Sequence, residues 1–162
     1  MKLILTWNKE DDIKGIPVDK RVPITIFVHS YGGDLYSAMG FLSVMKLSKC
    51  LIKTVNLSCA MSCGALIFIN GHKGHRYALK NSTALLHSGS AAQGGSYDSV
   101  VQQTQQYKNL ISRVNENILE NTKISKATLT KKMKTDWYLD DNMQLEYSLC
   151  DYVVDDISQI IS

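Results

Sequence analysis

A serine, a histidine and an aspartate in this chain could share proton-transfer chemistry. Ser62 lies in the stretch 60–64 (AMSCG), between a β-branched run and an apolar helical run. A serine on such a sharp turn can lift its hydroxyl out of the sheet, as in a nucleophile elbow. The first glycine of that elbow is replaced by Ala60, so an N-cap role for Ser62 is the simpler interpretation when the residue is taken alone.

His87 and Asp136 are the residue types that activate a serine. His87 follows the apolar run 83–86 and precedes a Ser/Gly-rich stretch, and an imidazole at a strand exit can take a proton from a hydroxyl. Asp136 stands beside Trp137 in a lysine-rich region, where partial burial would suit a carboxylate that orients an imidazole. Separately, a structural histidine and a turn aspartate fit equally well.

Gly32 and Gly33 lie between a predicted strand and a predicted helix. Backbone N–H groups at such a place are free to point at an anion or a developing oxyanion. No third glycine and no Gly-Lys-Ser/Thr follow, which excludes a Rossmann or P-loop fingerprint. Taken alone, the pair also fits a tight turn without a ligand.

No residue pattern predicts a metal or a cofactor. Cys59 and Cys63 do not have zinc-ligand spacing, and a nucleophilic Cys63 would need its own base. His72 and His75 lie in a glycine-flanked turn, which favours a solvated loop over a metal site. We therefore expect four reduced thiols, at Cys50, Cys59, Cys63 and Cys150.

Composition narrows the class of protein. The 162 residues are 44% hydrophobic and 20% charged, as in one folded, soluble domain. The net charge of +3 is small and scattered, so no nucleic-acid partner is expected. The longest apolar stretch, 64–69, is too short for a bilayer, and no secretory signal begins the chain. We expect a cytoplasmic protein without a membrane partner.

Short β-branched runs alternate with helical patterns along the chain, which predicts an α/β fold with parallel strands and crossover helices. Strands are expected at 2–6, 24–28, 52–57, 76–79, 83–86 and 152–154. Helices are expected at 34–48, about 62–70, 97–121, from about 125 and from 141. Gln144, three residues after Asp141, resembles the end of a capping box.

The helix expected at 97–121 carries one apolar seam. At 1.5 Å per residue, about 25 residues extend roughly 37 Å, which is long for a domain of this size. The seam must be buried, which favours an oligomer. It consists of Val100, Thr104, Tyr107, Ile111, Val114 and Ile118.

From Ile24 to about Asp155 the chain resembles the proteolytic subunit of the Clp protease, the ClpP family, within the ClpP/crotonase superfamily. The matching stretches are 30–33 (SYGG for the family's SPGG), 60–65 (AMSCGA for AASMGA), 73–82 (KGHRYALKNS for KGKRFALPNS), 85–87 (LLH) and 146–151 (EYSLCD for EYGLVD). His87 follows Ser62 by 25 positions and Asp136 follows His87 by 49, as in the family's triad.

The resemblance implies a single domain over 1–162, with the ClpP/crotonase-like superhelix of repeated β-β-α units. A head (about 1–87 and 122–162) would carry a protruding handle (about 88–121) made of a strand and the long helix.

The resemblance also implies a role for each candidate residue. Ser62 would be the nucleophile, His87 the general base and Asp136 the group that fixes the imidazole tautomer. The backbone N–H groups of Gly33 and Cys63 would form the oxyanion hole. Neither metal nor cofactor would take part.

The activity implied is that of a serine endopeptidase subunit that cleaves peptides and unfolded proteins. Copies of the chain would form two stacked seven-membered rings around a chamber, fed by an AAA+ unfoldase. Two alternatives stay open. One is a catalytically inactive ClpP-like ring subunit, and the other is a crotonase-type acyl-CoA enzyme, which would not explain Ser62, His87 and Asp136 together.

The chain departs from the family pattern at three places. His29 and Tyr31 replace the family's asparagine and proline, so we expect an altered turn before the glycines. Thr135 and Trp137 stand where arginines of the ring-to-ring contact are usual, so that contact would be built differently. Only about twenty residues precede the strand at Ile24, which we expect to be too few for the family's axial loop and full first helix.

Overall fold

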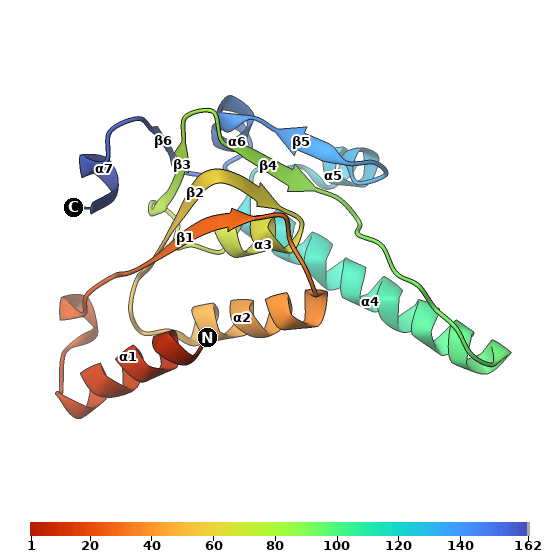
Figure 1. Ribbon diagram of the computed structural model, residues 1–162, viewed down its shortest axis with the longest axis horizontal. Helices are drawn as coiled ribbons and strands as arrows, with labels where there is room; N and C mark the ends of the chain where they lie inside the picture. Colours follow the sequence, from red (N-terminus) through yellow and green to blue (C-terminus); the bar gives the residue numbers. More distant parts are fainter. Residues whose placement is uncertain (162) are drawn as a thin grey trace.

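A six-stranded sheet with helices around it forms the core of the chain, whose computed structural model describes residues 1–161 (Figure 1). The strands are β1 (Ile24–Ser30), β2 (Ile52–Met61), β3 (Arg76–Leu79), β4 (Thr83–Leu86), β5 (Trp137–Leu139) and β6 (Tyr152–Val154). The helices are α1 (Lys2–Ile13), α2 (Leu35–Leu47), α3 (Cys63–Ile69), α4 (Tyr97–Asn121), α5 (Lys126–Lys132), α6 (Asp141–Glu146) and α7 (Ser158–Ile161), with a 3₁₀ helix η1 (Val18–Lys20). The mixed α/β architecture confirms the expected fold class.

Strand β2 organises the sheet because both of its edges are used. β1 runs parallel along one edge. The other edge is shared, since Thr54–Asn56 pair with β3 and Cys59–Met61 pair with β4, both in parallel. Sharing one edge between two strands spreads β3 and β4 apart, so the sheet curls (Figure 1). The carboxyl ends of β2 and β4 therefore lie side by side.

The sheet continues outward from β3 and β4 in different ways. β6 pairs with β3 in parallel, whereas β5 pairs with β4 in antiparallel register. The sequence did not predict β5. Only Trp137 and Leu139 of its three residues are buried, and so short a run is too brief to reveal a period of two.

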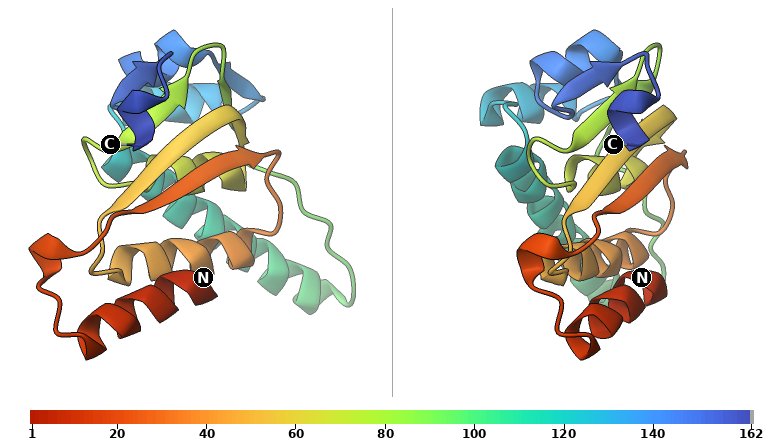
Figure 2. Two further views of the ribbon diagram at one scale, coloured as in Figure 1. Left: turned by 60° about the vertical axis from the view of Figure 1, so that its left-hand side comes forward. Right: turned by 90° about the vertical axis from the view of Figure 1, so that its left-hand side faces the viewer.

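Helix α3 is the most deeply buried helix of the core. It packs against β1, β2 and β4 on one side and against α2 and α4 on the other. Six of its seven residues are buried, with Phe68 and Ile69 fully enclosed. Figure 2 shows α1 and α2 stacked below the sheet and α5 and α6 at its opposite end. Helix α3, and with it the position of Cys63 at its start, is therefore fixed by packing on both the sheet side and the helix side.

The first helix, α1, corrects one expectation. Residues 2–6 were expected to form a strand, yet they belong to a 12-residue helix, Lys2–Ile13. The expectation that this segment is too short for the family's axial loop and full first helix stays a prediction. The inward face of α1 is mostly polar, and Ile4 is its only buried residue. An apolar periodicity therefore could not reveal the helix.

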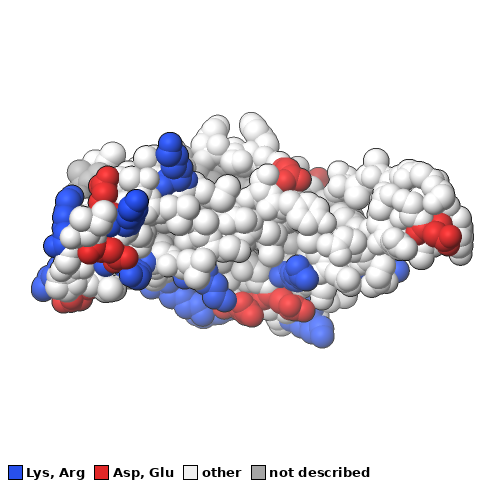
Figure 3. Space-filling view, turned by 90° about the horizontal axis from the view of Figure 1, so that it is seen from below, with Lys and Arg blue, Asp and Glu red and all other residues white. Residues whose placement is uncertain are grey.

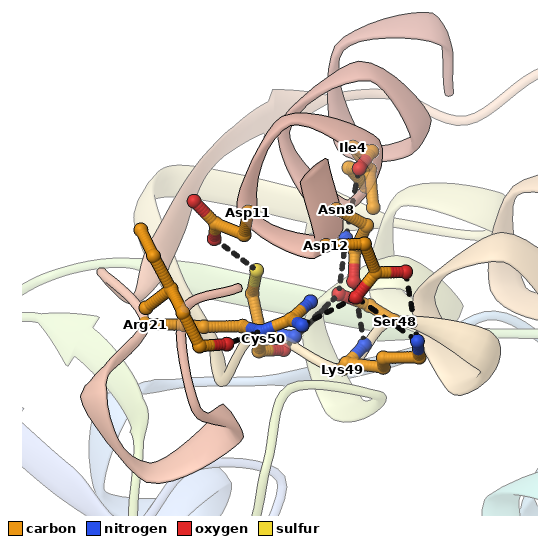
Figure 4. Close-up of polar contacts among 9 residues, drawn as sticks. Ile4, Asn8, Asp11, Asp12, Arg21, Ser48, Lys49 and Cys50 are labelled. Carbon is orange, nitrogen blue, oxygen red and sulfur yellow. Dashed lines mark hydrogen bonds and ion pairs between the residues drawn. The ribbon is translucent and has the colours of Figure 1, made fainter. Parts of the chain in front are cut away.

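Polar contacts fasten α1 to the loop after α2 (Figure 4). Asn8 donates from Nδ2 to Ser48 Oγ at 3.0 Å and accepts from the Lys49 N–H at 2.7 Å. Asp12 pairs with Arg21 and with Lys49 Nζ, the latter at 2.8 Å. The hydrogen bonds from Lys49 and Arg21 hold the pKa of the Asp12 carboxyl below its usual value. Helical spacing of Asn8 and Asp12 aligns these groups on one face.

The expected capping box at α6 is wrong. The cap of α6 is Asp140, whose side chain accepts from the Met143 N–H at 2.8 Å. Gln144 is fully buried and its amide points into the core instead. A glutamine three residues after an acidic residue has the capping pattern, but only the direction of the helix decides where its side chain goes.

Helix α4 projects away from the sheet (Figure 1). Its C-terminal half packs on the head, where Leu110, Val114 and Ile118 are buried, while Tyr97 near its tip is 82% exposed. Residues 88–96 run outward from β4 to the tip where α4 begins, and no strand is found among them in the described chain. Their strand was expected from the family's handle, but a strand requires a neighbouring backbone to pair with.

The apolar seam of α4 is partly covered within the chain, with Val114 and Ile118 buried against the head. Tyr107 donates its hydroxyl to the Ser88 carbonyl at 2.7 Å, and Thr104 Oγ1 donates to Gln93 Oε1 at 2.5 Å. The segment 88–96 thus lies against the half of α4 that extends beyond the head. Four of the six seam residues, Val100, Thr104, Tyr107 and Ile111, are only half-buried within the chain, so the oligomer that the seam favours stays a prediction.

Charged side chains of both signs mix on the surface. In the view from below, the charged side chains gather at the α1 end and along the lower edge of the picture. The middle of this face is largely uncharged (Figure 3). No extended patch of one sign covers this face. None of the helices in residues 1–161 combines the length and hydrophobicity that a membrane span requires.

Candidate active site

Ser62 occupies the turn from β2 into α3 in a strained backbone conformation. Its φ of 54° and ψ of −121° are unusual for a residue with a side chain. The Ser62 N–H donates to the Leu85 carbonyl of β4 at 2.9 Å, which fixes the turn. Ser62 occupies the N-cap position of α3, as the N-cap interpretation expects, but its side chain makes no capping hydrogen bond to the helix.

Glycine is required at position 32 because the β1–α2 turn crosses directly over Ser62. A Cβ atom at Gly32 would lie 2.7 Å from Ser62 Cβ, and its φ of +107° also favours glycine. Ser30 Oγ accepts from the Gly32 N–H at 3.1 Å and steadies the turn. The two turns that the sequence analysis identified separately are therefore in contact.

His87 and Asp136 come together through the β4–β5 ladder. Leu86 pairs with Trp137, so His87 and Asp136 are the next facing positions beyond the last pair. His87 Nδ1 lies 3.2 Å from Asp136 Oδ1, and His87 Nε2 lies 2.8 Å from Ser62 Oγ. A carboxylate only accepts, so Nδ1 carries the proton and Nε2 is left to accept from the Ser62 hydroxyl.

The three side chains differ in exposure. The His87 side chain is 30% exposed and that of Asp136 is 56% exposed. The expected partial burial of Asp136 beside its aromatic neighbours is not found, because Trp137 turns into the core and packs edge-on against Tyr147 at 5.2 Å. Solvent therefore screens the contact between Asp136 and His87.

Gly33 and Cys63, whose backbone N–H groups were expected to form an oxyanion hole, line the same cavity as Ser62. Among the turn, loop and cap hydrogen bonds of residues 1–161, neither the Gly33 N–H nor the Cys63 N–H is engaged. Cys63 Sγ donates to the Gly33 carbonyl at 3.2 Å, which holds the two turns together. Burial raises the pKa of the Cys63 thiol, so the sulfur is a neutral donor at neutral pH.

A cavity of about 340 Å³ opens beside these groups. Gly33, Ser62, Cys63 and His87 all line it. Most of its remaining wall is apolar and comes from α2, α3, β4 and α4. These apolar residues are Leu35, Leu66, Leu86, Leu110, Ile111, Val114 and Ile118.

His29, one of the two residues before the glycines that depart from the family pattern, makes a second serine–histidine contact. His29 Nδ1 lies 2.6 Å from Ser58 Oγ, where the β1–β2 ladder changes register. Tyr31 is 78% exposed and its ring lies edge-on to His29 at 6.5 Å. This contact is at the surface, outside the residues that line the cavity.

The histidine and cysteine residues that were weighed as metal ligands or nucleophiles make structural contacts or are buried. His72 Nδ1 accepts from the Ile52 N–H at 3.0 Å. Within residues 1–161, no group of three or more His, Cys, Asp and Glu side chains is arranged to hold a metal ion. All four cysteines are buried free thiols. Burial raises the pKa of Cys150 to about 12.

Sequence reasoning missed one buried polar pair, Asn56 and Gln144. Asn56 Nδ2 donates to Gln144 Oε1 at 2.9 Å, and both residues are fully enclosed. The available signal was an asparagine inside the apolar strand 52–57. A buried amide needs a partner, but the sequence does not say that the partner lies 88 positions away.

The curled sheet, the projecting α4 and the buried α3 define an α/β protein of the ClpP/crotonase type. The Clp protease family pattern matches residues 17–156, so the chain belongs to the Clp protease family.

Its relatives include ATP-dependent Clp protease proteolytic subunits at modest identity. The chain is 27% identical to that of Deinococcus radiodurans over 132 residues, 82% of this chain and 65% of the relative. It is 30% identical to proteolytic subunit 2 of Corynebacterium diphtheriae, over 82% of this chain and 66% of the relative. The protein of Paracoccus denitrificans is 28% identical over 88% of this chain and 71% of the relative. The chain thus spans about two thirds of the length of these relatives.

Proposed function

We propose that this chain is a serine endopeptidase subunit that cleaves peptides and unfolded proteins. The observation that carries the proposal is the continuous hydrogen-bonded path from Ser62 Oγ through His87 to Asp136 at the edge of an apolar cavity. Membership in the Clp protease family supports the same activity.

In the proposed reaction Ser62 Oγ attacks the scissile carbonyl carbon while its proton passes to His87 Nε2. Asp136 holds the imidazole through Nδ1–H and stabilises its charged form. The N–H groups of Gly33 and Cys63 receive the oxyanion. The imidazolium then gives its proton to the leaving amine as the C–N bond breaks, which leaves an acyl group on Ser62.

Water completes the cycle by the same path in reverse. His87 takes a proton from the water as it attacks the acyl carbon, and the proton then returns to Ser62 Oγ as the acid product leaves. The apolar wall of the cavity favours an uncharged, apolar side chain next to the scissile bond, because a charged one would lose its hydration there.

We also propose that copies of the chain form two stacked seven-membered rings around a chamber, in the cytoplasm, with an AAA+ unfoldase as partner. Support comes from the projecting α4 and from relatives named ATP-dependent proteolytic subunits. Native mass spectrometry of the purified chain tests the assembly, and a mass of fourteen chains is the expected result. A stable monomer would contradict it.

The activity is tested by labelling with a fluorophosphonate and by hydrolysis of a fluorogenic peptide. Ser62→Ala should abolish both. Ser58→Ala is the matched control, because Ser58 also contacts a histidine nitrogen, at 2.6 Å, and should leave both intact. Undiminished labelling of Ser62→Ala would exclude Ser62 as the nucleophile. A well-formed ring without any Ser62-dependent hydrolysis would favour an inactive structural subunit.

A further inference from the structure

The buried amides of Asn56 and Gln144 connect the three strands that carry the candidate active-site residues. Asn56 on β2 donates to the Thr83 carbonyl of β4 at 3.2 Å and to Gln144 Oε1 at 2.9 Å. Gln144 Nε2 donates to the carbonyls of Ser82 at 3.0 Å and Leu139 at 3.3 Å. The amide nitrogen of each residue donates to oxygen atoms. These contacts therefore determine which end of each amide is the nitrogen and which is the oxygen.

These contacts lie at one end of the β4–β5 ladder, and His87 and Asp136 lie at the other. β4 makes three pairs with β2 and three with β5. The burial of Trp137 and Leu139 already favours one register of β5, since a slip of one residue would turn them out of the core and Asp136 to the opposite face. A link between Ser82, at the start of β4, and Leu139, at the end of β5, opposes such a slip.

The pair is also distinct from the cavity. Neither Asn56 nor Gln144 lines it, and both are fully enclosed. A role in substrate binding is therefore excluded by position, whereas a role in setting the strand register is favoured. Asn56 Oδ1 has no hydrogen-bond partner among the described residues, so this buried amide is satisfied only through Nδ2, and loss of Gln144 would remove one of its two contacts.

We propose that Asn56 and Gln144 are positioning residues that hold β4 and β5 in register on β2, so that His87 and Asp136 meet Ser62. This inference rests on the proposed peptidase function. The two amides act through the strands and never touch the substrate.

The test compares Gln144→Met, which keeps the length of the side chain and removes its hydrogen bonds, with Ile52→Val. Ile52 is fully buried on the same strand β2, and its truncation lowers stability without touching the amide pair. For Gln144→Met we expect kcat to fall on the order of 10- to 100-fold with KM within about twofold, because geometry is lost while the cavity is kept. Ile52→Val should lower Tm by an amount similar to that of Gln144→Met, but its kcat should stay within about twofold of the wild-type value.

A double-mutant cycle adds a second readout. If the two amides act as one unit, Asn56→Leu combined with Gln144→Met should lower kcat about as much as either change alone. Fully additive losses would overturn the idea of a coupled pair. If Gln144→Met does not fold, Asn56→Ser applies the same test from β2.

The ring nitrogens of His87 provide a measurement that does not depend on activity. Their ¹⁵N shifts should report a single Nδ1–H tautomer in the wild type and a mixture of tautomers in Gln144→Met. An unchanged tautomer together with a wild-type kcat in a folded Gln144→Met protein overturns the proposal. Wild-type protein without Ser62-dependent turnover would instead refute the peptidase function, and the ¹⁵N comparison would still decide whether the amides position His87.

Discussion

Strand β2 and the turn that follows it carry two serine–histidine contacts only four residues apart, and the surroundings of the two contacts differ. Ser58 Oγ lies 2.6 Å from His29 Nδ1, and Ser62 Oγ lies 2.8 Å from His87 Nε2. His87 has Asp136 on its other nitrogen at 3.2 Å. No acidic residue among those described makes a hydrogen bond or ion pair with His29.

The backbone separates the two contacts further. Ser62 is held at a φ of 54° and lines a cavity together with Gly33 and Cys63. Ser58 lies within β2, where the β1–β2 ladder changes register, and is exposed. Proximity of a serine to a histidine is thus no sufficient sign of a nucleophile. Ser62 differs from Ser58 in the carboxylate behind its histidine and in the cavity beside it, and for these reasons we propose Ser62 and not Ser58 as the nucleophile.

The largest expected effect separates the two serines directly. Ser62→Ala should lower kcat for a peptide substrate on the order of 10⁴- to 10⁶-fold, because the nucleophile is lost. Ser58→Ala should change it by less than about twofold. Steady-state hydrolysis by both purified variants measures the contrast, and equal losses would erase the distinction between the two contacts.

The second largest effect is expected from Asp136→Asn, because Asp136 contacts His87 and not His29. Asp136→Asn should lower kcat on the order of 10²- to 10⁴-fold, because an amide at this place can leave His87 in the wrong tautomer. The solvent-open position of Asp136 puts the expected loss toward the lower end of that range. Activity within about threefold of the wild type would show that His87 works without the carboxylate.

A smaller loss of kcat is expected from a change in the β1–α2 turn, which crosses over Ser62 but not over Ser58. Gly32→Ala would place a Cβ 2.7 Å from Ser62 Cβ, so the turn must shift. We expect kcat to fall roughly 10- to 100-fold and the free energy of unfolding to fall by about 1–3 kcal/mol. Kinetics and urea unfolding of the same preparation measure both. A wild-type kcat would mean that the turn can move without disturbing Ser62.

Cys63 allows a test of the competing nucleophile beside Ser62. Burial raises the pKa of its thiol, so the thiolate is scarce at pH 7 and grows more abundant as pH rises toward that pKa. Iodoacetamide should therefore modify Cys63 roughly tenfold or more slowly than a free cysteine at pH 7, and faster at higher pH. Peptide mass spectrometry gives the rates. Rapid alkylation at pH 7 would indicate an activated thiol.

The smallest effect is expected at the surface histidine. His29→Gln keeps a polar side chain near Ser58 and should change kcat by less than about twofold, because His29 does not line the cavity. Peptide hydrolysis across pH 6 to 9 should give matching profiles for variant and wild type. A large change in either would show that the surface contact influences the turn at Gly32.

The chain pattern predicted much of the fold, since the bounds expected for β3, β4, α4 and β6 are those observed. It failed at α1, where the helical face is polar and Asn8 and Asp12 do the docking. It also failed at β5, which is too short to carry a period and is defined only by pairing with β4. Local patterns reveal an element when burial is apolar and repeated, and fail when a distant partner defines it.

What the sequence alone determined is which side chains are available and roughly where the elements bearing them begin and end. It identified Ser62, His87 and Asp136 as candidates and placed Gly32 and Gly33 at a strand-to-helix turn. Tertiary structure decided which serine meets which histidine, because β1 brings His29 to Ser58 while β4 brings His87 to Ser62. It also turned Gln144 from a capping position into the core. Those outcomes depend on contacts between distant segments, which no local pattern in the chain encodes.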